Sequence, residues 1–584
     1  MLLVAAFVVV AVGLTFPHLG VAATRIPGNA GDGLLNVWIM RAVQTGLPHG
    51  WHALWDAPIF YPSLNTLAFS DGLIPVALVH WPLRTMFGDA LAFNIIYLGA
   101  WVMSSWCMYR LARRFVTYWG AAVVAALAYT YSSIRLVHYE HFQLVVGGAL
   151  VPLVLLLLLR CTDRPSPRRG IALGVAFATL TLTASYYGAM MGLFVLVIAA
   201  GSVFTVRGEE RRRMFVALAL AGVVVFVLAA PIGVHYLLLE RDPAFRRAFV
   251  PAAASHLTDF LASGLGNHVL SRVPVIGHYT QQPSRGVENR LFPGMVATTF
   301  AVIGATVVTR EVRRHGWGST RLRELLLTVA AAVVVVALSF GDWFRLARHR
   351  VPLPFAWFRH TVPGFSGIRA TSRLALGGEL AVAIFAAIGI DKIILRHWQR
   401  RPRLALIATL GLSAIVLAEA APSLFFVTVP TTANDGGIDQ ALRALPAGVV
   451  LELPIRSDTS GYAWPFVEAP RQLVAIHDGD ARVNGYSGFQ PPNFDGRAAL
   501  LNRFPASDAI TEAQHIGVRY VVLRTALVST DLPADQLQHL NTDGIGRYTL
   551  AHAKSIIQNL PPNAVIQTQR LAGGYLIQLD PVAG

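Results

Sequence analysis

The chain has 584 residues, of which 54% are hydrophobic and only 14% are charged, and its mean hydropathy is +0.52. Soluble domains carry about 25% charged residues, so this composition excludes a water-soluble enzyme. The net charge is +16. Most basic residues separate apolar runs and do not gather on an amphipathic face with aromatic residues between them, which argues against nucleic-acid binding.

Apolar runs of membrane-crossing length recur along the first 427 residues. A spanning helix needs about 20 apolar residues. The first run, 2–23, has no basic segment before it, so we interpret it as an uncleaved first span and not as a signal peptide. The runs at 171–185 and 187–204 could form one broken helix. In all, about eleven spans are predicted: 2–23, 91–109, 121–131, 144–159, 171–185, 187–204, 214–239, 291–309, 325–340, 374–394 and 404–427.

The distribution of basic residues predicts the orientation of these spans. Arginine and lysine cluster at 110–114, 164–169, 207–213, 310–323 and 392–403. If the N-terminus is cytoplasmic, all five clusters lie in cytoplasmic loops, as the positive-inside rule requires. The segment after the last span is then extracytoplasmic. We expect the membrane that the spans cross to be a bacterial inner membrane.

Two outer loops, 24–90 and 240–290, follow from this topology. In the first loop, segment 32–44 has the apolar spacing of a helix, and segment 72–87 is apolar but short. We expect both to lie in the membrane interface. Four tryptophans are expected at headgroup depth there: Trp38, Trp51, Trp55 and Trp81.

The C-terminal part, 428–584, has the pattern of a soluble α/β domain. Segments 448–454 and 518–524 are apolar and β-branched, as strands are, and 574–579 is a third candidate. A helix is expected over 507–516, ended by Gly517. Neither cysteine (Cys107, Cys161) lies in this part, so no disulfide framework is expected in it. The predicted domains are a helical membrane domain, 1–427, and this extracytoplasmic α/β domain.

Asp32 is the first candidate for chemistry, because it follows the first span and has a glycine on each side. The glycines would let the backbone turn tightly and approach a ligand. A carboxylate there could act as a general base. The alternative is a helix N-cap, since an amphipathic run follows. Asp71 is a lesser candidate of the same kind.

A second group surrounds the start of the fourth span, with Arg135 before it. His138 and His141 are three residues apart and would share a helix face, with Glu140 between them. Ionisable residues at a membrane boundary are often functional. A metal pair would lack its third ligand, and polar side chains facing lipid headgroups are the alternative.

Arginine is concentrated in the outer stretch 342–373, against the positive-inside trend. Guanidinium groups pair well with phosphate oxygens, so we interpret the stretch as a phosphate site. Attraction to anionic lipids and a wrong topology are the alternatives. Glu288, before the eighth span, is a second candidate carboxylate, or an acid paired with Arg290. The stretch holds one acid, Asp342, and six arginines: Arg345, Arg348, Arg350, Arg359, Arg369 and Arg373.

Short motifs throughout the chain resemble GT-C membrane glycosyltransferases, in particular a bacterial group that includes YfhO-like proteins. These motifs are Gly31–Trp38 (GDGLLNVW), Ile59–Pro62 (IFYP), Arg135 with His138 and His141, Leu291–Gly294 (LFPG), Val362–Gly364 (VPG) with Ile368, Arg369 and Arg373, and Asn484–Gly488 (NGYSG).

The resemblance implies a sugar donor linked to polyprenyl phosphate or diphosphate and transfer to an acceptor on the outer membrane face. It implies that Asp32 is the base and that Arg369 and Arg373, with Arg135, hold the donor phosphate. The Asp-Asp or Asp-Glu pair of some families is absent, because Gly33 follows Asp32. A divalent metal is left open, and no other cofactor is expected. A transporter or flippase, or a non-catalytic scaffold for envelope glycans, are the alternative functions.

Overall fold

The structure is a computed structural model of the chain. It describes residues 1–15, 19–242, 245, 250–264, 267, 269–283, 285–316, 319–346, 349–398, 400–421, 424–528 and 532–580. The contacts divide the chain into two compact units. A helical unit comprises residues 1–19, 95–240 and 246–424, and a mixed α/β unit comprises residues 20–94, 241–245 and 425–584.

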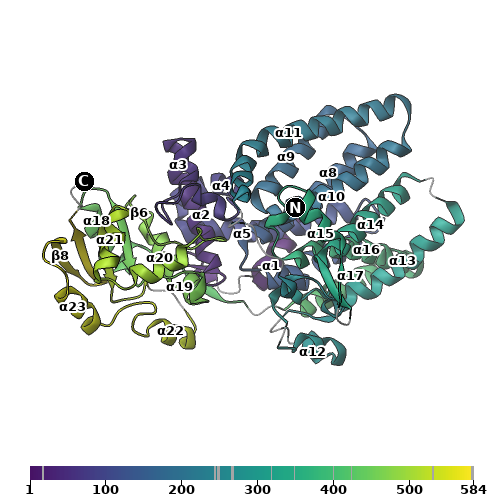
Figure 1. Cartoon of the computed structure of the whole chain (residues 1–584). Helices are drawn as coiled ribbons and strands as arrows, with labels where there is room; N and C mark the ends of the chain where they lie inside the picture. The colour runs from purple at the N-terminus through teal and green to yellow at the C-terminus, as the bar shows by residue number, and fades with distance from the viewer. Residues whose placement is uncertain are drawn as a thin grey trace. The chain divides into compact units, whose positions relative to one another are not determined.

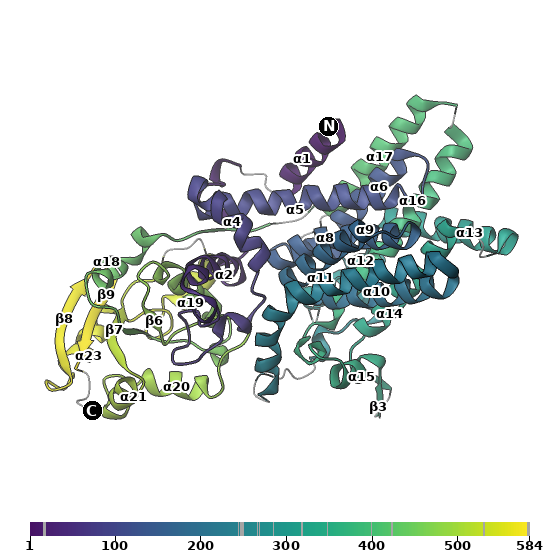
Figure 2. The same cartoon turned by 90° about the horizontal axis from the view of Figure 1, so that it is seen from above.

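All eleven predicted spans fall on helices of the helical unit (Figures 1 and 2). Nine helices in the described residues are long and apolar enough to cross a membrane. The other two, α1 (Leu2–Thr15) and α9 (Pro167–Thr183), are shorter. The nine are α5 (Asp89–Ala112), α6 (Trp119–Thr130) continued by α7 (Ser133–Val137), α8 (Phe142–Asp163), α10 (Ser185–Thr205), α11 (Gly208–Arg241), α13 (Met295–His315), α14 (Thr320–Ser339), α16 (Leu376–Trp398) and α17 (Pro402–Ala420).

Small residues let several of these helices pack closely. A Cβ atom added at Gly170 or Gly174 of α9 would lie 2.2 or 2.7 Å from the carbonyl oxygen of Ala217 or Ala221 of α11. This small-xxx-small pairing is typical of helices that associate in membranes. Between α9 and α10 the backbone is extended at Ala184, so these two runs form two helices and not one broken helix.

Shorter elements connect the helices of this unit. They are α12 (Pro274–Thr280), α15 (Pro354–Thr361) and the antiparallel pair β2 (Trp343–Leu346) and β3 (His349–Pro352). Gly294, which ends the LFPG motif, has φ +104° and precedes α13. The Glu419 carboxylate accepts hydrogen bonds from the backbone N–H groups of Met295 and Val296 at 2.8 and 3.3 Å. The motif therefore directly precedes a helix whose N-terminal N–H groups are capped by an acidic side chain.

The α/β unit contains a five-stranded sheet in the order β6-β5-β7-β9-β8. β5 pairs with β6 and β7 in parallel, and β9 is antiparallel to both neighbours. The three predicted strands correspond to β5 (Val449–Leu453), β7 (Val518–Arg524) and β9 (Gly574–Leu579), and the predicted helix is α21 (Ser507–His515). The patterns at β6 (Ala481–Arg482) and β8 (Val565–Leu571) were not recognised in the sequence.

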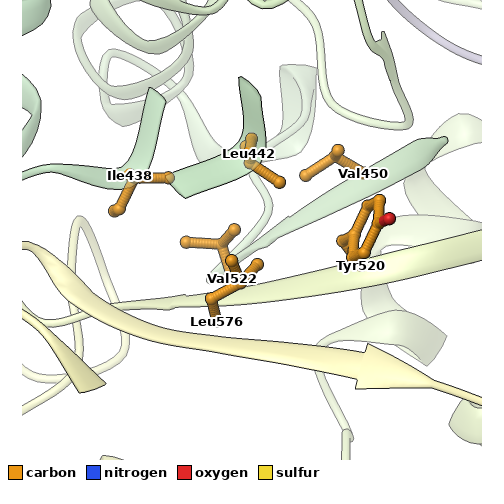
Figure 3. Close-up of a cluster of buried hydrophobic side chains, with 6 residues drawn as sticks. All are labelled: Ile438, Leu442, Val450, Tyr520, Val522 and Leu576. Atoms are coloured by element: carbon orange, nitrogen blue, oxygen red, sulfur yellow. The ribbon is translucent and has the colours of Figure 1, made fainter. Parts of the chain in front are cut away.

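One face of this sheet is covered by α18 (Ile438–Arg443). Figure 3 shows six buried side chains that meet there: Ile438, Leu442, Val450, Tyr520, Val522 and Leu576. The remaining helices of the C-terminal part are α19 (Ala463–Ala475), α20 (Phe494–Leu501), α22 (Ala534–Leu540) and α23 (Leu550–Gln558).

A buried ionic network joins the strands of this sheet. Glu452 on β5 accepts hydrogen bonds from Arg524 on β7 at 2.6 Å and from Arg482 on β6 at 3.3 Å. Arg524 also pairs with Asp435, and Arg482 with Asp478. All five side chains are almost fully buried, so each charge depends on its partners for stabilisation.

The segment 24–90, predicted as an outer loop of the helical domain, belongs by its contacts to the α/β unit. It contains β1 (Arg25–Pro27), α2 (Asp32–Gly46), α3 (Trp51–Trp55) and α4 (Ile74–Phe87). β1 pairs antiparallel with β4 (Phe426–Thr428), and α2 packs against α19. The backbone N–H of Phe60 donates to the carbonyl of Asn484 at 3.0 Å. The compact unit is thus built from both sides of the predicted boundary at 427.

The expectation that both helices of this segment lie in the membrane interface is wrong for α2. Most residues of α2 are buried, including Trp38 (1% exposed), because α2 lies between α4 and α19. Trp55 is also buried at 1%, whereas Trp51 is 42% exposed and Trp81 is half-buried. Leu78, Val79 and Met86 of α4 remain exposed, so only α4 keeps an apolar face of the interfacial type.

Candidate active site

Asp32 is the first residue of α2, but it does not cap that helix with its side chain. The helix cap position is Gly31. The Asn29 side chain instead accepts hydrogen bonds from the backbone N–H groups of Gly31 and Asp32, at 2.8 and 3.0 Å. Asn29 therefore holds the backbone just before α2, although it is not the N-cap residue. The carboxylate of Asp32 is half-buried.

The Tyr486 hydroxyl donates to Oδ1 of Asp32 at 2.6 Å. Both residues belong to the α/β unit, although 454 positions separate them in the chain. Tyr486 is the third residue of the NGYSG motif. Sequence reasoning quoted that motif but gave Tyr486 no role, and the motif was the only signal that pointed to it.

Gly31, the glycine before Asp32, is required by protein packing. A Cβ atom at Gly31 would lie 2.7 Å from Cβ of Pro465, near the start of α19. A Cβ atom at Gly33 would meet only ordinary contacts, the nearest at 3.7 Å. Close contact with Pro465 of the same unit thus explains why position 31 is a glycine. The sequence had suggested instead that the glycine leaves room for a ligand.

A second cluster lies in the helical unit around Glu288. Arg373 donates to Oε1 of Glu288 from Nη2 at 2.6 Å and from Nε at 3.0 Å. Ser372 donates to Oε2 at 3.2 Å, and Nε2 of His138 lies 3.5 Å from the same oxygen. The predicted alternative partner, Arg290, instead donates to the backbone carbonyls of Ser263 and Thr280, so that pairing is wrong.

Charge and burial set the protonation states in this cluster. Burial alone would raise the pKa of Glu288, but the Arg373 guanidinium outweighs it and holds this pKa well below its usual range. Burial lowers the pKa of His138 to about 3, against the opposing effect of Glu288. We therefore expect Glu288 to be ionised and His138 to be neutral at physiological pH.

His138 and His141 do not share a helix face, contrary to the sequence interpretation. His138 ends α7 and His141 precedes α8, so both lie in the turn between these helices. Their rings still meet edge to face, with centroids 5.1 Å apart. Glu140, in the same turn, is half-buried, as is Asp71 before α4 of the α/β unit.

Tyr186 of α10 links the two predicted phosphate-binding arginines. The Arg373 guanidinium lies over its ring, 4.9 Å from the centroid, and its hydroxyl accepts a hydrogen bond from the backbone N–H of Arg369 at 3.1 Å. The Arg369 side chain is exposed. Among the other arginines of this stretch, Arg359 pairs with Asp342 at 3.0 Å. Arg348 and the side chain of Arg345 lie outside the described part of the chain.

Arg135, the third predicted phosphate ligand, packs against aromatic residues in this structure. Its guanidinium is buried and lies over the rings of Trp101 and Tyr129, 5.1 and 5.4 Å from their centroids. Gly148 of α8 makes room for it, since a Cβ atom there would lie 1.8 Å from Nη1. This arrangement favours a packing role.

Replacing Gly148 with alanine should therefore destabilise the helical unit. The guanidinium lies over two aromatic rings, and moving it to admit a Cβ atom would give up these contacts. We expect a loss of about 1–3 kcal/mol, the usual range for overpacking, measured as a lower melting temperature of the purified protein. Gly99→Ala is the matched control, because no atom lies within 4 Å of a Cβ at that glycine. Equal melting temperatures for both variants would contradict this account of Arg135.

Within the described residues, no group of three or more His, Cys, Asp or Glu side chains is arranged to hold a metal ion. The two clusters around Asp32 and Glu288 are therefore the candidates for chemistry. The residues named in each cluster belong to one of the two units.

Comparison with known proteins identifies the fold. No protein-family model and no curated protein matches the chain. Among solved structures, the arabinofuranosyltransferase AftD from Mycobacteria aligns with a TM-score of 0.59 and 14% identity, over 99% of this chain and 40% of AftD. The chain has the GT-C glycosyltransferase fold. A variant of AftD gives the same TM-score at 15% identity, over 98% of this chain and 41% of the variant.

The oligosaccharyltransferase from Archaeoglobus fulgidus is more distant. It aligns with a TM-score of 0.49 and 12% identity, over 89% of this chain and 69% of that protein, and adds nothing to the assignment. The chain spans about two-fifths of AftD. At these identities the GT-C similarity establishes the fold alone, and the YfhO-like subgroup stays a prediction.

Proposed function

We propose that this GT-C-fold protein is a membrane glycosyltransferase. It would transfer a sugar from a polyprenyl-phosphate-linked donor to a glycan, lipid or other acceptor of the cell envelope, on the outer face of the bacterial cytoplasmic membrane. The observation that carries the proposal is the carboxylate of Asp32, which follows the first predicted span and is held by the Tyr486 hydroxyl at 2.6 Å.

The proposed reaction is a displacement at the anomeric carbon of the donor sugar. Asp32 takes the proton of the acceptor hydroxyl as the acceptor oxygen forms its bond to that carbon. The bond between the anomeric carbon and the phosphate oxygen breaks, and the electron pair leaves with the lipid phosphate. Cationic side chains stabilise the negative charge that develops there.

Arginines of the helical unit are the proposed phosphate ligands. The exposed guanidinium of Arg369 is available for a phosphate contact, whereas the charge of Arg373 is shared with Glu288. We therefore assign direct contact to Arg369. Glu288, Ser372 and neutral His138 would keep Arg373 in place beside it, which makes positioning a better role for Glu288 and His138 than proton transfer.

Arg369→Gln should weaken binding of polyprenyl phosphate by about tenfold or more, because a hydrogen bond between charged groups is worth roughly 1.5–3 kcal/mol. Binding can be measured by native mass spectrometry of the purified protein with polyprenyl phosphate. Arg212→Gln is the matched control, since Arg212 is an exposed arginine that pairs with Glu209 on α11. If both variants bind as well as the wild type, Arg369 is not a phosphate ligand.

The proposed function is tested by mass spectrometry of envelope glycans and glycolipids from three strains. The gene is deleted, then restored as wild type or as Asp32→Asn at matched abundance in the membrane. The proposal requires that deletion shortens one glycan by a sugar, that wild type restores it, and that Asp32→Asn does not. Full restoration by Asp32→Asn would favour the transporter or scaffold alternatives.

A further inference from the structure

The geometry around Asp32 points to a further functional residue, contributed by the C-terminal part of the chain. We infer that Tyr486 is a positioning residue, whose hydroxyl orients the Asp32 carboxylate for the acceptor. This inference rests on the proposed function, because it assigns Tyr486 a task in the same reaction. The 2.6 Å hydrogen bond is the direct contact between them.

The backbone of Tyr486 is clamped by one buried side chain. Gln472 on α19 accepts from the N–H of Tyr486 at 2.9 Å and donates to its carbonyl at 3.1 Å. Gln472 is only 4% exposed. A reciprocal pair of hydrogen bonds from a buried amide fixes both the position and the direction of the peptide that carries the tyrosine.

The aromatic ring of Tyr486 is held as firmly as its backbone. It meets the ring of Trp464 edge to face, with centroids 5.0 Å apart. Trp464 is itself anchored, because its indole N–H donates to the carbonyl of Gly485 at 2.7 Å. The hydroxyl can therefore hardly move relative to α19.

The residues before Tyr486 are anchored to the sheet and to the segment that carries Asp32. The Asn484 amide donates to the carbonyl of Glu452 on β5 and accepts from the N–H of the same residue, both at 2.8 Å. Gly485 lies against Phe60, since a Cβ atom there would come within 2.9 Å of the phenyl ring. The NGYSG motif thus joins the sheet to the segment between the first two spans.

Asp32, which accepts the hydrogen bond of the Tyr486 hydroxyl, is also held in place by its neighbours. Asn29 accepts the backbone N–H of Asp32, and the Asn36 amide donates to its carbonyl at 2.7 Å. Two rigid elements therefore meet at one hydrogen bond between side chains. Such a bond restricts rotation of the carboxylate, and a base held in one orientation reacts faster than one that samples several.

Alternative explanations of the contact make different predictions. If Tyr486 only stabilises the fold, losing its hydroxyl should cost what any buried tyrosine hydrogen bond costs, about 1 kcal/mol. Tyr520 provides this comparison in the same unit, because its hydroxyl donates to the backbone carbonyl of Pro446 at 2.7 Å. Tyr520 makes no contact with Asp32 in the described structure.

The test compares Tyr486→Phe, Tyr520→Phe and Asp32→Asn in membranes isolated from the deletion strain, which contain the native donor and acceptor. The sugar transferred is followed by mass spectrometry at matched protein abundance, and the melting temperatures of the purified variants are compared. Tyr486→Phe should transfer about 10- to 100-fold more slowly than wild type. The melting temperatures of Tyr486→Phe and Tyr520→Phe should fall by a similar amount, because each variant loses one tyrosine hydrogen bond.

Each outcome separates the inference from the proposed function. If Tyr486→Phe keeps the wild-type rate, or loses no more activity than Tyr520→Phe, the positioning role is wrong while the glycosyltransferase function stands. If Asp32→Asn itself transfers at the wild-type rate, the proposed function fails first. A slower rate in Tyr486→Phe alone of the two tyrosine variants, at similar melting temperatures, supports the inference. Because the two variants lose comparable tyrosine hydrogen bonds, a folding defect does not explain a difference in rate between them.

Discussion

Asp32→Asn should reduce sugar transfer by about 10²- to 10⁴-fold, the range expected when a general base is removed. The exchange is nearly isosteric. The amide keeps an oxygen that can accept the hydrogen bond of Tyr486, and Asn29 still accepts the backbone N–H at position 32. The fold should therefore survive while the proton acceptor is lost. The rate is measured in isolated membranes, and the melting temperature of the purified variant is expected to stay close to that of wild type.

A matched control for this exchange lies in the same segment of the chain. Asp56 is exposed, and its Oδ1 accepts the backbone N–H of Asn65 at 2.7 Å. Asparagine can also accept this bond, so Asp56→Asn should transfer at the wild-type rate. An equal loss in both variants would show that the effect of Asp32→Asn is not specific to a base.

Glu452→Gln should have the largest effect on stability among the changes considered. Glu452 lies at the centre of the ionic network and compensates the buried charges of Arg482 and Arg524. Removing one partner of a buried ion pair costs about 3–5 kcal/mol. Asp435 and Asp478 would then be the remaining acidic partners of the two arginines. The α/β unit should then unfold at a markedly lower temperature or denaturant concentration.

The pH dependence of this loss follows from the pKa of Glu452. Burial alone would raise that pKa, but Arg524, Arg482 and Arg471 together lower it to about 2, from an ordinary value of 4.5. Because the folded-state pKa is depressed, the contribution of Glu452 is fully present above about pH 4.5. It is lost as the pH falls towards 2. The difference in unfolding free energy between wild type and Glu452→Gln should therefore shrink over that interval.

A surface pair provides the comparison for Glu452→Gln. Glu512 pairs with Arg497 at 3.3 Å, and both side chains are about 30% exposed. Pairs of this kind contribute about 0–1 kcal/mol, so Glu512→Gln should unfold almost as wild type does. If Glu452→Gln were equally mild, the buried network would not be what stabilises the sheet.

The clearest successes of sequence reasoning concern elements whose signal is local. Each of the eleven predicted spans overlaps a helix, and nine helices in the described residues are long and apolar enough to cross a membrane. A long apolar run can satisfy its backbone only within itself in a lipid environment. β5, β7 and β9 were also recognised, since short β-branched runs between turn residues carry the strand signal. The GT-C fold was anticipated from short motifs that resemble those of GT-C membrane glycosyltransferases.

Local sequence patterns could not predict that residues of the first loop are buried by protein. The apolar spacing of α2 is the same whether its apolar face meets lipid or protein. The protein surface that covers it belongs to α19, more than 400 positions later in the chain. Trp38 therefore looked like a headgroup anchor in the sequence, although it packs in the core of the α/β unit.

The sequence by itself determined the class of this protein, its apolar spans, its α/β segment and the residue types available for chemistry, because hydrophobicity and turn chemistry act over a few neighbouring residues. Only the tertiary structure decided which of those residues act together. It paired Glu288 with Arg373 and not with the neighbouring Arg290, and it joined Asp32 to Tyr486. Which side chains become partners depends on how distant backbone segments pack, and this long-range packing produces no periodic pattern in the sequence.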